Sequence, residues 1–579
     1  MSKILRVNMT DLTANYEDVP EQYKLLGGRG LTSSIVADEV EPMCHPLGPN
    51  NRLVFAPGIV TGTTAPTSAR ISVGAKSPLT GGIKESNAGT KFSQMLARLG
   101  IKAIVVEGQP RDGAWYVLEI DKDGARMSPA GDLVGSGAYA TTDTLISQYG
   151  KIGVCCIGQA GEMKMTNAGV AFNDMGDHAS RYSGRGGLGA VMGSKGLKAI
   201  VVNDKGGPGV DIANKDLFDQ GRLKLRDALL SHDVTKPKGG LNTYGTAVLV
   251  NIMNEAGGLP TRNFSSGFFE GAPKIAGEAI FEGVKQRTGK ETYNHGCSPG
   301  CIIQCSNTWY KPDGSAHVSC QEYESVWSFG ANCGIDDLDV TGELIRLSND
   351  FGLDTIEAGV TIGIAMEGGL AAFGDGQRAI ELMHEIGSGT PLGRILGQGA
   401  AFTAQALGVT RVPTVKGQAM PAYEPRAVKG IGVTYITTTQ GADHTAGYTI
   451  APEILGVSGK VDPMTPEGKA ELSRNFQIAT AFIDTSGYCL FIAFAILDIA
   501  TGFEGMVESC AGVLGTDWTA DDATRIGKEI LKVERAFNEA AGLTKADDRP
   551  PEFMLYEPLP PHNGVWDISG QVLDSVWDF

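Results

Sequence analysis

The pattern of apolar and polar positions divides the chain into a strand-rich beginning and a helix-rich remainder. Up to about Lys205, short apolar runs rich in Val and Ile alternate with glycine-rich turns, which is typical of strands. We therefore expect a sheet-rich first region. The predicted strands are Ile4–Val7, Leu53–Ala56, Ala103–Glu107, Trp115–Ile120, Val154–Ile157 and Ala199–Val202.

After the turn-forming break Gly206–Gly209, the apolar period lengthens to that of a helix, as in Tyr244–Glu255. A proline-rich passage, Pro413–Pro425, indicates a further boundary before a second helical region, and the tail after Arg549 is predicted to wrap the surface. The predicted fold class is α+β, with a β-rich N-terminal base domain and two mostly helical domains. Their predicted limits are 1–207, 208–410 and 411–579.

Composition narrows the function classes. The 579 residues carry a formal net charge of -17, which argues against binding to a nucleic-acid backbone because that needs a basic face. The first residues lack an apolar leader, and the longest apolar run, Cys489–Leu497, is too short to span a bilayer. We expect a cytoplasmic protein without membrane insertion.

Three thiols at Cys297, Cys301 and Cys305 are the strongest chemical signal in the chain. A buried helical stripe is the alternative, but Pro299 and Gly300 lie inside the run and disfavour a helix. A zinc ion and an iron–sulfur cluster both take four ligands, and the spacing alone does not separate them. The predicted fourth ligand is Cys489.

The stretch Gly184–Gly189 matches the G-x-G-x-x-G pattern of dinucleotide-binding loops. That function needs a strand before the loop and a long helix after it. The preceding segment, Asn173–Ser183, is polar and is predicted not to be a strand, so we reject the dinucleotide interpretation. A glycine-rich loop that approaches another anion, helped by Arg181 and Arg185, stays open.

One short element recurs in Asn349–Asp354 and Asp484–Cys489. Each copy has a polar residue, two spacers, a glycine, an apolar residue and a final residue that can act as a ligand. Taken alone, each copy is typical of a joint between two helices. In the first copy, Asp354 is predicted to cap a helix and Glu357 to complete a capping box.

Two further positions carry groups suited to proton transfer. Glu324 follows the cysteine group, and His444 lies in the third predicted domain. Each residue taken singly is most often an ordinary hydrogen-bonded side chain. Together in a water-poor pocket, they would supply a base and an electrophile or acid.

The combination resembles the tungsten-dependent aldehyde:ferredoxin oxidoreductase family. The similarity runs from Ile4 to about Pro551. It is carried by Gly27–Leu31, Lys76–Gly81, Gly184–Lys195, Tyr244–Asn251, Glu322–Trp327, Gly352–Ile356 and Pro452–Gly456. The resemblance implies a β-rich base that holds two pterin cofactors and two helical domains that close over them. It also implies that pterin sulfurs, and no protein side chain, bind the tungsten.

The resemblance also implies roles for particular residues. Arg70 would contact pterin phosphate, and Asn87 with a backbone carbonyl near Tyr182 would position a Mg²⁺ ion that joins the phosphates. The two recurring elements would recognise the pterins, and Cys297, Cys301, Cys305 and Cys489 would ligate one [4Fe–4S] cluster. The implied pterin-binding residues are Arg181, Arg185, Asn349, Gly352, Leu353, Asp354, Asp484, Gly487 and Tyr488.

The implied reaction is the oxidation of an aldehyde to a carboxylic acid, with electrons leaving through the cluster to a ferredoxin or a ferredoxin-like subunit, with or without a flavin or NAD subunit. Glu324 would be the base, and His444 would hydrogen-bond the substrate carbonyl. Two alternatives stay open. The same scaffold could reduce acids or activated aromatic rings, or the chain could be an iron–sulfur scaffold without a working tungsten site.

Three positions depart from the family pattern. Three residues separate Cys297 from Cys301 where two are usual, which predicts a local bulge. Asn349 stands where an aspartate is usual, and an amide can donate as well as accept. Arg346 breaks the E-x-x-H element that binds an interface iron in some members. We therefore expect a hetero-oligomer or filament in place of an iron-bridged homodimer.

Overall fold

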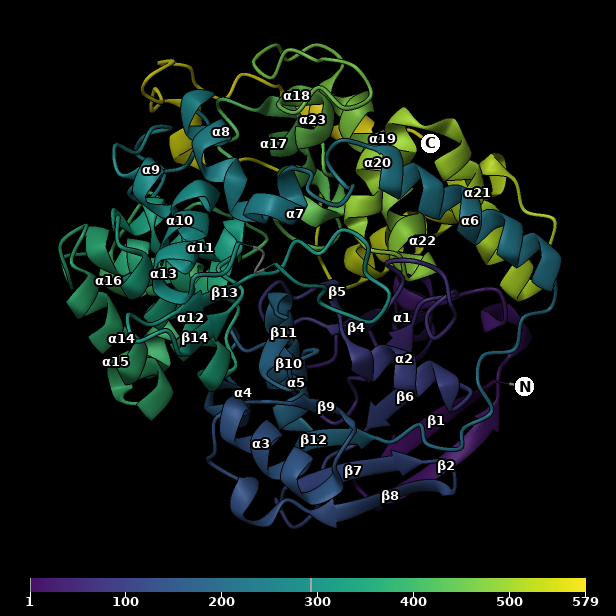
Figure 1. Cartoon of the computed structure of the whole chain (residues 1–579). Coiled ribbons are helices and arrows are strands. Elements are labelled where there is room, and N and C mark those ends of the chain that lie inside the picture. The colour runs from purple at the N-terminus through teal and green to yellow at the C-terminus, as the bar shows by residue number, and fades with distance from the viewer. Residues whose placement is uncertain (1, 292–293) are drawn as a thin grey trace.

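The computed structural model describes residues 2–291 and 294–579. It confirms the predicted fold class, because two six-stranded sheets fill the first 202 residues and helices dominate the rest. Figure 1 shows the sheets below, with α10–α16 above them on the left and α19–α22 on the right. The site described below lies where these three parts meet.

The first sheet has the strand order β2-β1-β6-β3-β4-β5. Strands β1 and β6 pair in parallel, and the other neighbours pair antiparallel. All of its strands come from the first 107 residues. They are β1 (Lys3–Asn8), β2 (Thr13–Asp18), β3 (Leu53–Pro57), β4 (Arg70–Lys76), β5 (Ile83–Gly89) and β6 (Ile101–Glu107).

The second sheet repeats this topology strand for strand, in the order β8-β7-β12-β9-β10-β11. Here β7 and β12 form the parallel pair. The repeat is visible in the sequence, where Gly100–Val106 (GIKAIVV) matches Gly196–Val202 (GLKAIVV). The strands are β7 (Tyr116–Asp121), β8 (Gly124–Pro129), β9 (Gly153–Cys156), β10 (Val170–Asn173), β11 (Ala179–Ser183) and β12 (Leu197–Val202).

The connecting helices follow the same repeat. Helices α1 (Gly28–Glu39) and α3 (Ala138–Tyr149) precede the third strand of each sheet, and α2 (Lys91–Arg98) and α5 (Leu188–Ser194) precede the sixth. The two sheets share one buried core, to which α2 and α5 contribute Phe92 and Leu188, among others. The N-terminal domain is therefore two copies of one motif packed together.

The glycine-rich loop corrects one sequence prediction. Residues Ala179–Ser183 do form a strand, β11, so the polar segment before Gly184 was wrongly read as lacking one. The backbone of β11 pairs with β10 in an antiparallel hairpin. A dinucleotide site needs parallel strands joined by a helix, so this topology still does not fit one.

The helical part begins at α6 (Lys215–Ser231), which lies along α21 in Figure 1. Close approach is possible because a side chain at Gly221 would meet the Gly505 carbonyl at 2.7 Å. The predicted helix Tyr244–Glu255 is broken by Gly245, whose φ is +67°. Small elements in this part are α7 (Gly240–Tyr244), α8 (Leu249–Glu255), α9 (Ala272–Ile275) and the hairpins β13 (Thr308–Tyr310) with β14 (Ala316–Ser319) and β15 (Thr414–Val415) with β16 (Gln418–Ala419). The short helix α4 (Gln159–Glu162) belongs to the base domain.

The remaining helices form the two groups above the sheets. The tail after Arg549 does more than wrap the surface, because Phe553, Met554 and Trp566 are buried in the main core. The helices are α10 (Gly277–Thr288), α11 (Tyr323–Phe329), α12 (Leu338–Phe351), α13 (Thr355–Glu367), α14 (Gly376–Ser388), α15 (Pro391–Leu396), α16 (Ala400–Leu407), α17 (Lys429–Thr437), α18 (Ile450–Glu453), α19 (Lys469–Ser486), α20 (Ala493–Asp498), α21 (Ala500–Leu514), α22 (Ala520–Ala540) and α23 (Gly570–Asp574).

Candidate functional site

The two recurring elements dock on equivalent places of the repeated sheets. We call Asn349–Asp354 the first loop and Asp484–Cys489 the second loop. Gly352 ends α12 with φ +78°, and a side chain there would meet the Gly158 nitrogen at 2.7 Å. Gly487 ends α19 with φ +92°, and a side chain on Gly58 would meet its Cα at 2.0 Å. Backbone-to-backbone contact explains why both elements need glycine.

A cavity of about 320 Å³ lies between the two loops and the sheets. It collects residues that are hundreds of positions apart in the sequence. The predicted site residues that line it are Arg70, Asn87, Arg181, Tyr182, Arg185, Cys297, Cys301, Cys305, Glu324, Asn349, Leu353, Asp354, His444, Asp484 and Cys489. Gly352, Gly487 and Tyr488 do not line it, and the Tyr488 ring is buried in the main core.

The three neighbouring cysteines lie on irregular backbone, as the proline and glycine predicted. Thr67 of the base domain joins this segment to the second loop. Its N–H donates to the Gly300 carbonyl at 3.0 Å, its hydroxyl accepts from the Ile302 N–H at 3.1 Å, and its carbonyl accepts from the Cys489 N–H at 3.0 Å. All four cysteines line the cavity, and Cys297, Cys305 and Cys489 lie close enough to Arg70 to raise its pKa. Hydrogen bonding to Cys301, with the charges of Arg70 and Arg181, lowers the pKa of Cys297.

Arg70 lies between the thiols and the rest of the cavity. It begins β4, and its Nη2 donates to the Cys489 sulfur at 3.0 Å. Its Nη1 donates to the Asn87 Oδ1 at 3.3 Å. Within the described residues no carboxylate pairs with this guanidinium, so its charge is available to an anion.

The other arginines of the cavity are paired. Arg181 contacts Glu322 at 3.3 Å, and Arg185 contacts Asp354 at 3.2 Å. Arg29, which the sequence analysis did not assign to the site, is 1 % exposed and donates two hydrogen bonds to Glu534. Its Nη1 also reaches Asp484 of the second loop at 3.4 Å. These pairs fix the walls of the cavity, because removing one partner would leave a buried charge uncompensated.

Glu324 and His444 come together although 120 positions separate them in the sequence. The Glu324 Oε1 lies 3.4 Å from the His444 Nε2, and its Oε2 accepts from the Ala422 N–H at 2.9 Å. Burial raises the pKa of Glu324 to about 8 and lowers the pKa of His444 to about 4. At neutral pH the Glu324 carboxyl group is therefore mostly protonated, and the His444 imidazole beside it is neutral.

Asp443 anchors the histidine segment. Lys84 of β5 lies 3.0 Å from its Oδ2, and although burial opposes them, Lys84 and Arg185 hold the pKa of Asp443 well below its usual range. Its Oδ1 accepts from the Thr445 N–H and caps the following turn. A charged carboxylate one residue before His444 thus ties this segment to the base domain.

Several buried polar atoms around the cavity have no hydrogen-bond partner. Buried polar groups are normally paired, so a cluster of orphans indicates a polar group that belongs between them. Among the described residues that line the cavity, the orphans are Glu85 Oε1, Arg181 Nε, Glu324 Oε1, Gln440 Nε2 and His444 Nδ1. The residues present fit a polar, hydrogen-bonding cofactor.

Two details of the first loop sharpen the sequence predictions. Asp354 caps α13 as expected, but Glu357 does not complete a capping box. Its carboxylate instead accepts from the Ala400 and Ala419 N–H groups. Asn349 uses its amide as a donor to the Tyr139 hydroxyl at 3.2 Å, and an ionised aspartate could not donate in this way.

The sequence analysis missed Arg29, Thr67, Glu85, Gln440 and Asp443. A signal existed for Glu85, because it and Asn87 lie two positions apart on β5 and so face the same side. Arg346, at the position that breaks the E-x-x-H element, packs on an aromatic ring. Its guanidinium lies over the Tyr139 ring, 5.2 Å from the centroid.

Comparison with known proteins gives matches along almost the whole chain. A family model described as the aldehyde ferredoxin oxidoreductase N-terminal domain matches residues 4–204. A second, described as domains 2 and 3 of the same family, matches residues 223–576. The tungsten-containing aldehyde ferredoxin oxidoreductase of Pyrococcus abyssi is 38% identical over 96% of this chain and 92% of its own length.

More distant relatives share the scaffold. The WOR-like subunit of an aliphatic sulfonate oxidoreductase of Pyrococcus furiosus is 25% identical over 96% of this chain and 90% of its own length. A solved structure of the BamBC active-site complex of benzoyl coenzyme A reductase superimposes with a TM-score of 0.79 at 19% identity, covering 100% of this chain and 93% of that one, which speaks for the fold alone. With both family models matched in sequence order, the chain belongs to the aldehyde ferredoxin oxidoreductase family.

Proposed function

We propose that the protein oxidises aldehydes to carboxylic acids with a tungsten bis-pterin cofactor. Water supplies the added oxygen, and each turnover releases two electrons and two protons. The observation that carries this proposal is the Glu324/His444 pair in the same cavity as four thiols. Retention of both residues favours aldehydes over the reduction of acids or aromatic rings.

The chain offers a symmetric holder for two pterins. The first loop, with Asn349, Leu353 and Asp354, would bind one, and the second loop, with Asp484, would bind the other; the backbones of Gly352, Gly487 and Tyr488 complete the turns. Arg70 would contact phosphate, supported by its lack of a carboxylate partner in the described part of the chain. Asn87 and a carbonyl near Tyr182 would hold Mg²⁺. When bound, the tungsten centre supplies the two-electron redox chemistry.

Cys297, Cys301, Cys305 and Cys489 would ligate one [4Fe–4S] cluster. They line the cavity, and the resemblance implies all four. Among the residues described, no three His, Cys, Asp or Glu side chains are grouped to hold a single metal ion. Four cysteine thiols that line one cavity match the usual ligand set of a [4Fe–4S] cluster. The cluster end is also the side on which a ferredoxin or ferredoxin-like subunit would take electrons one at a time.

The protein's own contribution to the chemistry is proton handling. The protonated carboxyl group of Glu324 lies 3.4 Å from the His444 Nε2, and we propose that the neutral imidazole carries its proton on Nδ1. Within the described structure Nδ1 has no hydrogen-bond partner, and the Asp443 Oδ1 lies 4.0 Å away, so this N–H can donate to the carbonyl oxygen of an aldehyde. After loss of its proton, the Glu324 carboxylate acts as the base that activates water.

The proposal extends to the assembly of the protein and to its location in the cell. We propose a hetero-oligomer or filament in the cytoplasm, since Arg346 stacks on Tyr139 where an interface iron ligand would be needed. None of the helices in the described residues has both the length and the apolar character that crossing a bilayer requires.

The decisive experiment is metal analysis followed by turnover with a panel of aldehydes and a viologen dye as acceptor. We expect tungsten and about four iron atoms per chain, and dye reduction with some of the aldehydes. Glu324→Gln should keep both metals and lose turnover. Iron without tungsten would support the scaffold alternative, and tungsten-loaded protein that oxidises no aldehyde would refute the proposed reaction.

A further inference from the structure

The two copies of the motif in the base domain differ at one short turn. In each copy a one-turn 3₁₀ helix lies between the second strand and the following long helix: η1 (Glu21–Tyr23) in the first copy and η2 (Gly131–Leu133) in the second. In both turns the N–H of the last residue donates to the carbonyl three residues earlier, at 3.0 Å for Tyr23 and 3.1 Å for Leu133. Tyr23 and Leu133 therefore stand at equivalent positions.

In the first copy, a tyrosine ring fills the space under this turn. Tyr23 is 3 % exposed and belongs to the same buried cluster as Ile4 of β1 and Ile35 of α1. Its hydroxyl donates to the Asp38 Oδ2 at 2.6 Å. The first copy thus encloses a phenol between an apolar wall and one polar acceptor, as a buried tyrosine requires.

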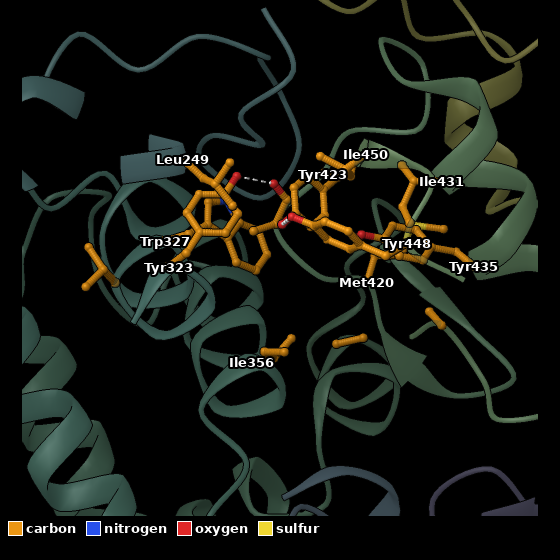
Figure 2. Packing of buried hydrophobic residues seen from close by; sticks show 14 of the residues in the cluster. Leu249, Tyr323, Trp327, Ile356, Met420, Tyr423, Ile431, Tyr435, Tyr448 and Ile450 are labelled. Atoms are coloured by element: carbon orange, nitrogen blue, oxygen red, sulfur yellow. Dashed lines mark hydrogen bonds between the residues drawn. The ribbon is translucent and has the colours of Figure 1, made fainter. Parts of the chain in front are cut away.

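Other buried phenols in the chain show the same arrangement. In the main core, the Tyr423 and Tyr448 hydroxyl groups bond each other at 2.8 Å, and Figure 2 shows their rings among apolar side chains. The Tyr323 hydroxyl donates to the Ala422 carbonyl at 2.7 Å. A space that receives a phenol in this protein therefore combines apolar walls with a polar group.

In the second copy, the corresponding space is a surface pocket of about 240 Å³. Val117, Leu145 and Gln148 line it. Each of them stands at the same position in β7 or α3 as a residue around the Tyr23 ring does in β1 or α1. Leu133 also lines the pocket, but its side chain is shorter than that of tyrosine. The pocket is therefore the place that a tyrosine ring fills in the first copy.

The lining suits a phenol in kind and in size. Val117, Ala130 and Leu145 are buried and form an apolar wall. The side chains of Asp132 and Gln148 line the pocket and are exposed, and within the described residues neither has a hydrogen-bond partner. The volume is below the roughly 300–1,000 Å³ of sites for drug-sized ligands, so the space suits a single ring.

We propose that this pocket binds a phenol group, with the ring between Val117 and Leu145 and the hydroxyl group on Gln148. The phenol comes from a small phenolic molecule or from a tyrosine side chain of a partner protein, because both present the same ring and hydroxyl group. None of the residues that line the pocket lines the cavity between the two loops. The site is therefore independent of the proposed aldehyde oxidation.

Photolabelling tests the location of the site. Light-activated 4-azidophenol on the purified holoenzyme, mapped by mass spectrometry, should label residues 117–149, and excess p-cresol should reduce this label about tenfold or more. Leu133→Tyr should lose the label, because its own ring fills the pocket. Val134→Tyr adds the same ring at an exposed neighbour that does not line the pocket, and it should keep the label. Label that is found only elsewhere, or that persists in Leu133→Tyr, would overturn the inference.

The hydroxyl contact can be tested without filling the pocket. In competition against the label, the unmodified protein should bind p-cresol about fivefold more tightly than toluene, as one hydrogen bond predicts. Gln148→Leu changes an exposed side chain of α3 and should remove this preference while thermal unfolding stays the same. Equal competition by p-cresol and toluene in the unmodified protein would show that the site does not recognise a phenol.

The source of the phenol is tested with N-acetyl-tyrosinamide, which carries the same ring on a peptide backbone. Competition as strong as that of p-cresol would support a tyrosine of a partner protein. Competition by p-cresol alone would support a small phenolic molecule. If neither compound competes with the label, no phenol site exists in this pocket.

Discussion

The two loops have the same backbone design but different final residues. Both follow a helix that ends in a left-handed glycine, and both dock against a glycine that follows the third strand of a six-stranded sheet. The first loop ends in Asp354, which caps α13 and pairs with Arg185. The second ends in Cys489, whose sulfur accepts a hydrogen bond from Arg70. The first loop thus ends in a residue that stabilises the fold, and the second loop ends in a thiol.

Under the proposed function, this difference would let electrons leave a symmetric site on one side only. Duplication of the base motif supplies two equivalent platforms, and a single change of residue type at the end of one loop connects only that side to the cysteines. The Glu324/His444 pair lies near the other side, where Arg185 and Asp354 influence Glu324. Proton transfer and electron exit are therefore expected at opposite ends of the cavity.

The largest expected effect comes from removing the thiol that distinguishes the loops. Cys489→Ser should lose the cluster and reduce acceptor-linked turnover to background, because a hydroxyl is a poor iron ligand. Iron content and EPR check this. Cys510→Ala, which removes a buried core thiol outside the cavity, is the matched control and should keep its iron. Full iron content in Cys489→Ser would break the proposed asymmetry.

The docking contact of each loop can be tested by filling it. Gly58→Ala should destabilise the fold by about 1–3 kcal/mol, because the added carbon would overlap the Gly487 Cα at 2.0 Å. Gly158→Ala, whose carbon would meet Phe351 at 2.4 Å, should cost a similar amount. Thermal unfolding and pterin content measure both, with Gly240→Ala as control: its added carbon meets nothing within 4 Å, and its φ lies outside the left-handed region. A large loss in only one of the pair would contradict the equivalence of the platforms.

The pH dependence probes the proton-handling side. Since burial raises the pKa of Glu324 to about 8, the carboxylate base forms only as the pH rises through that value. The rate of aldehyde oxidation should therefore increase about tenfold per pH unit below 8 and level off above it. His444 stays neutral over this range because its pKa is lowered to about 4. A profile that falls between pH 6 and 8 would show that Glu324 does not act as the base.

The smallest expected effect concerns the amide of the first loop. Asn349→Asp would give the two loops the same first residue but replace the amide donor with a carboxylate that can only accept from the Tyr139 hydroxyl, at a cost of about 1 kcal/mol. Pterin content should fall no more than a few fold. Tyr139→Phe removes the same bond from the other side, and the two substitutions should not be additive in thermal unfolding. Additive losses would show that the bond is not what Asn349 contributes.

Much of the fold could be read from local pattern. The six predicted strands are confirmed, because apolar runs between glycine turns specify strands without help from distant residues. Predictions failed where partners are remote. Strand β11 is mostly buried, but it lines the cavity with polar residues, so its sequence lacks the apolar pattern of a core strand. The Glu357 carboxylate accepts hydrogen bonds from backbone N–H groups of α16 and β16 and not from its own helix. Tertiary contacts, which the local sequence does not show, determine these partners.

The sequence by itself determined the chemical inventory: the thiol spacing, the two recurring loops, Glu324, His444 and the family to which they point. Only the tertiary structure decided which groups meet. The Thr67 bridge between the cysteine segments and the Arg29 pair with Glu534 join residues that lie far apart in the sequence. Contacts of this kind arise from packing around one buried space, and no local pattern encodes the distance between their members.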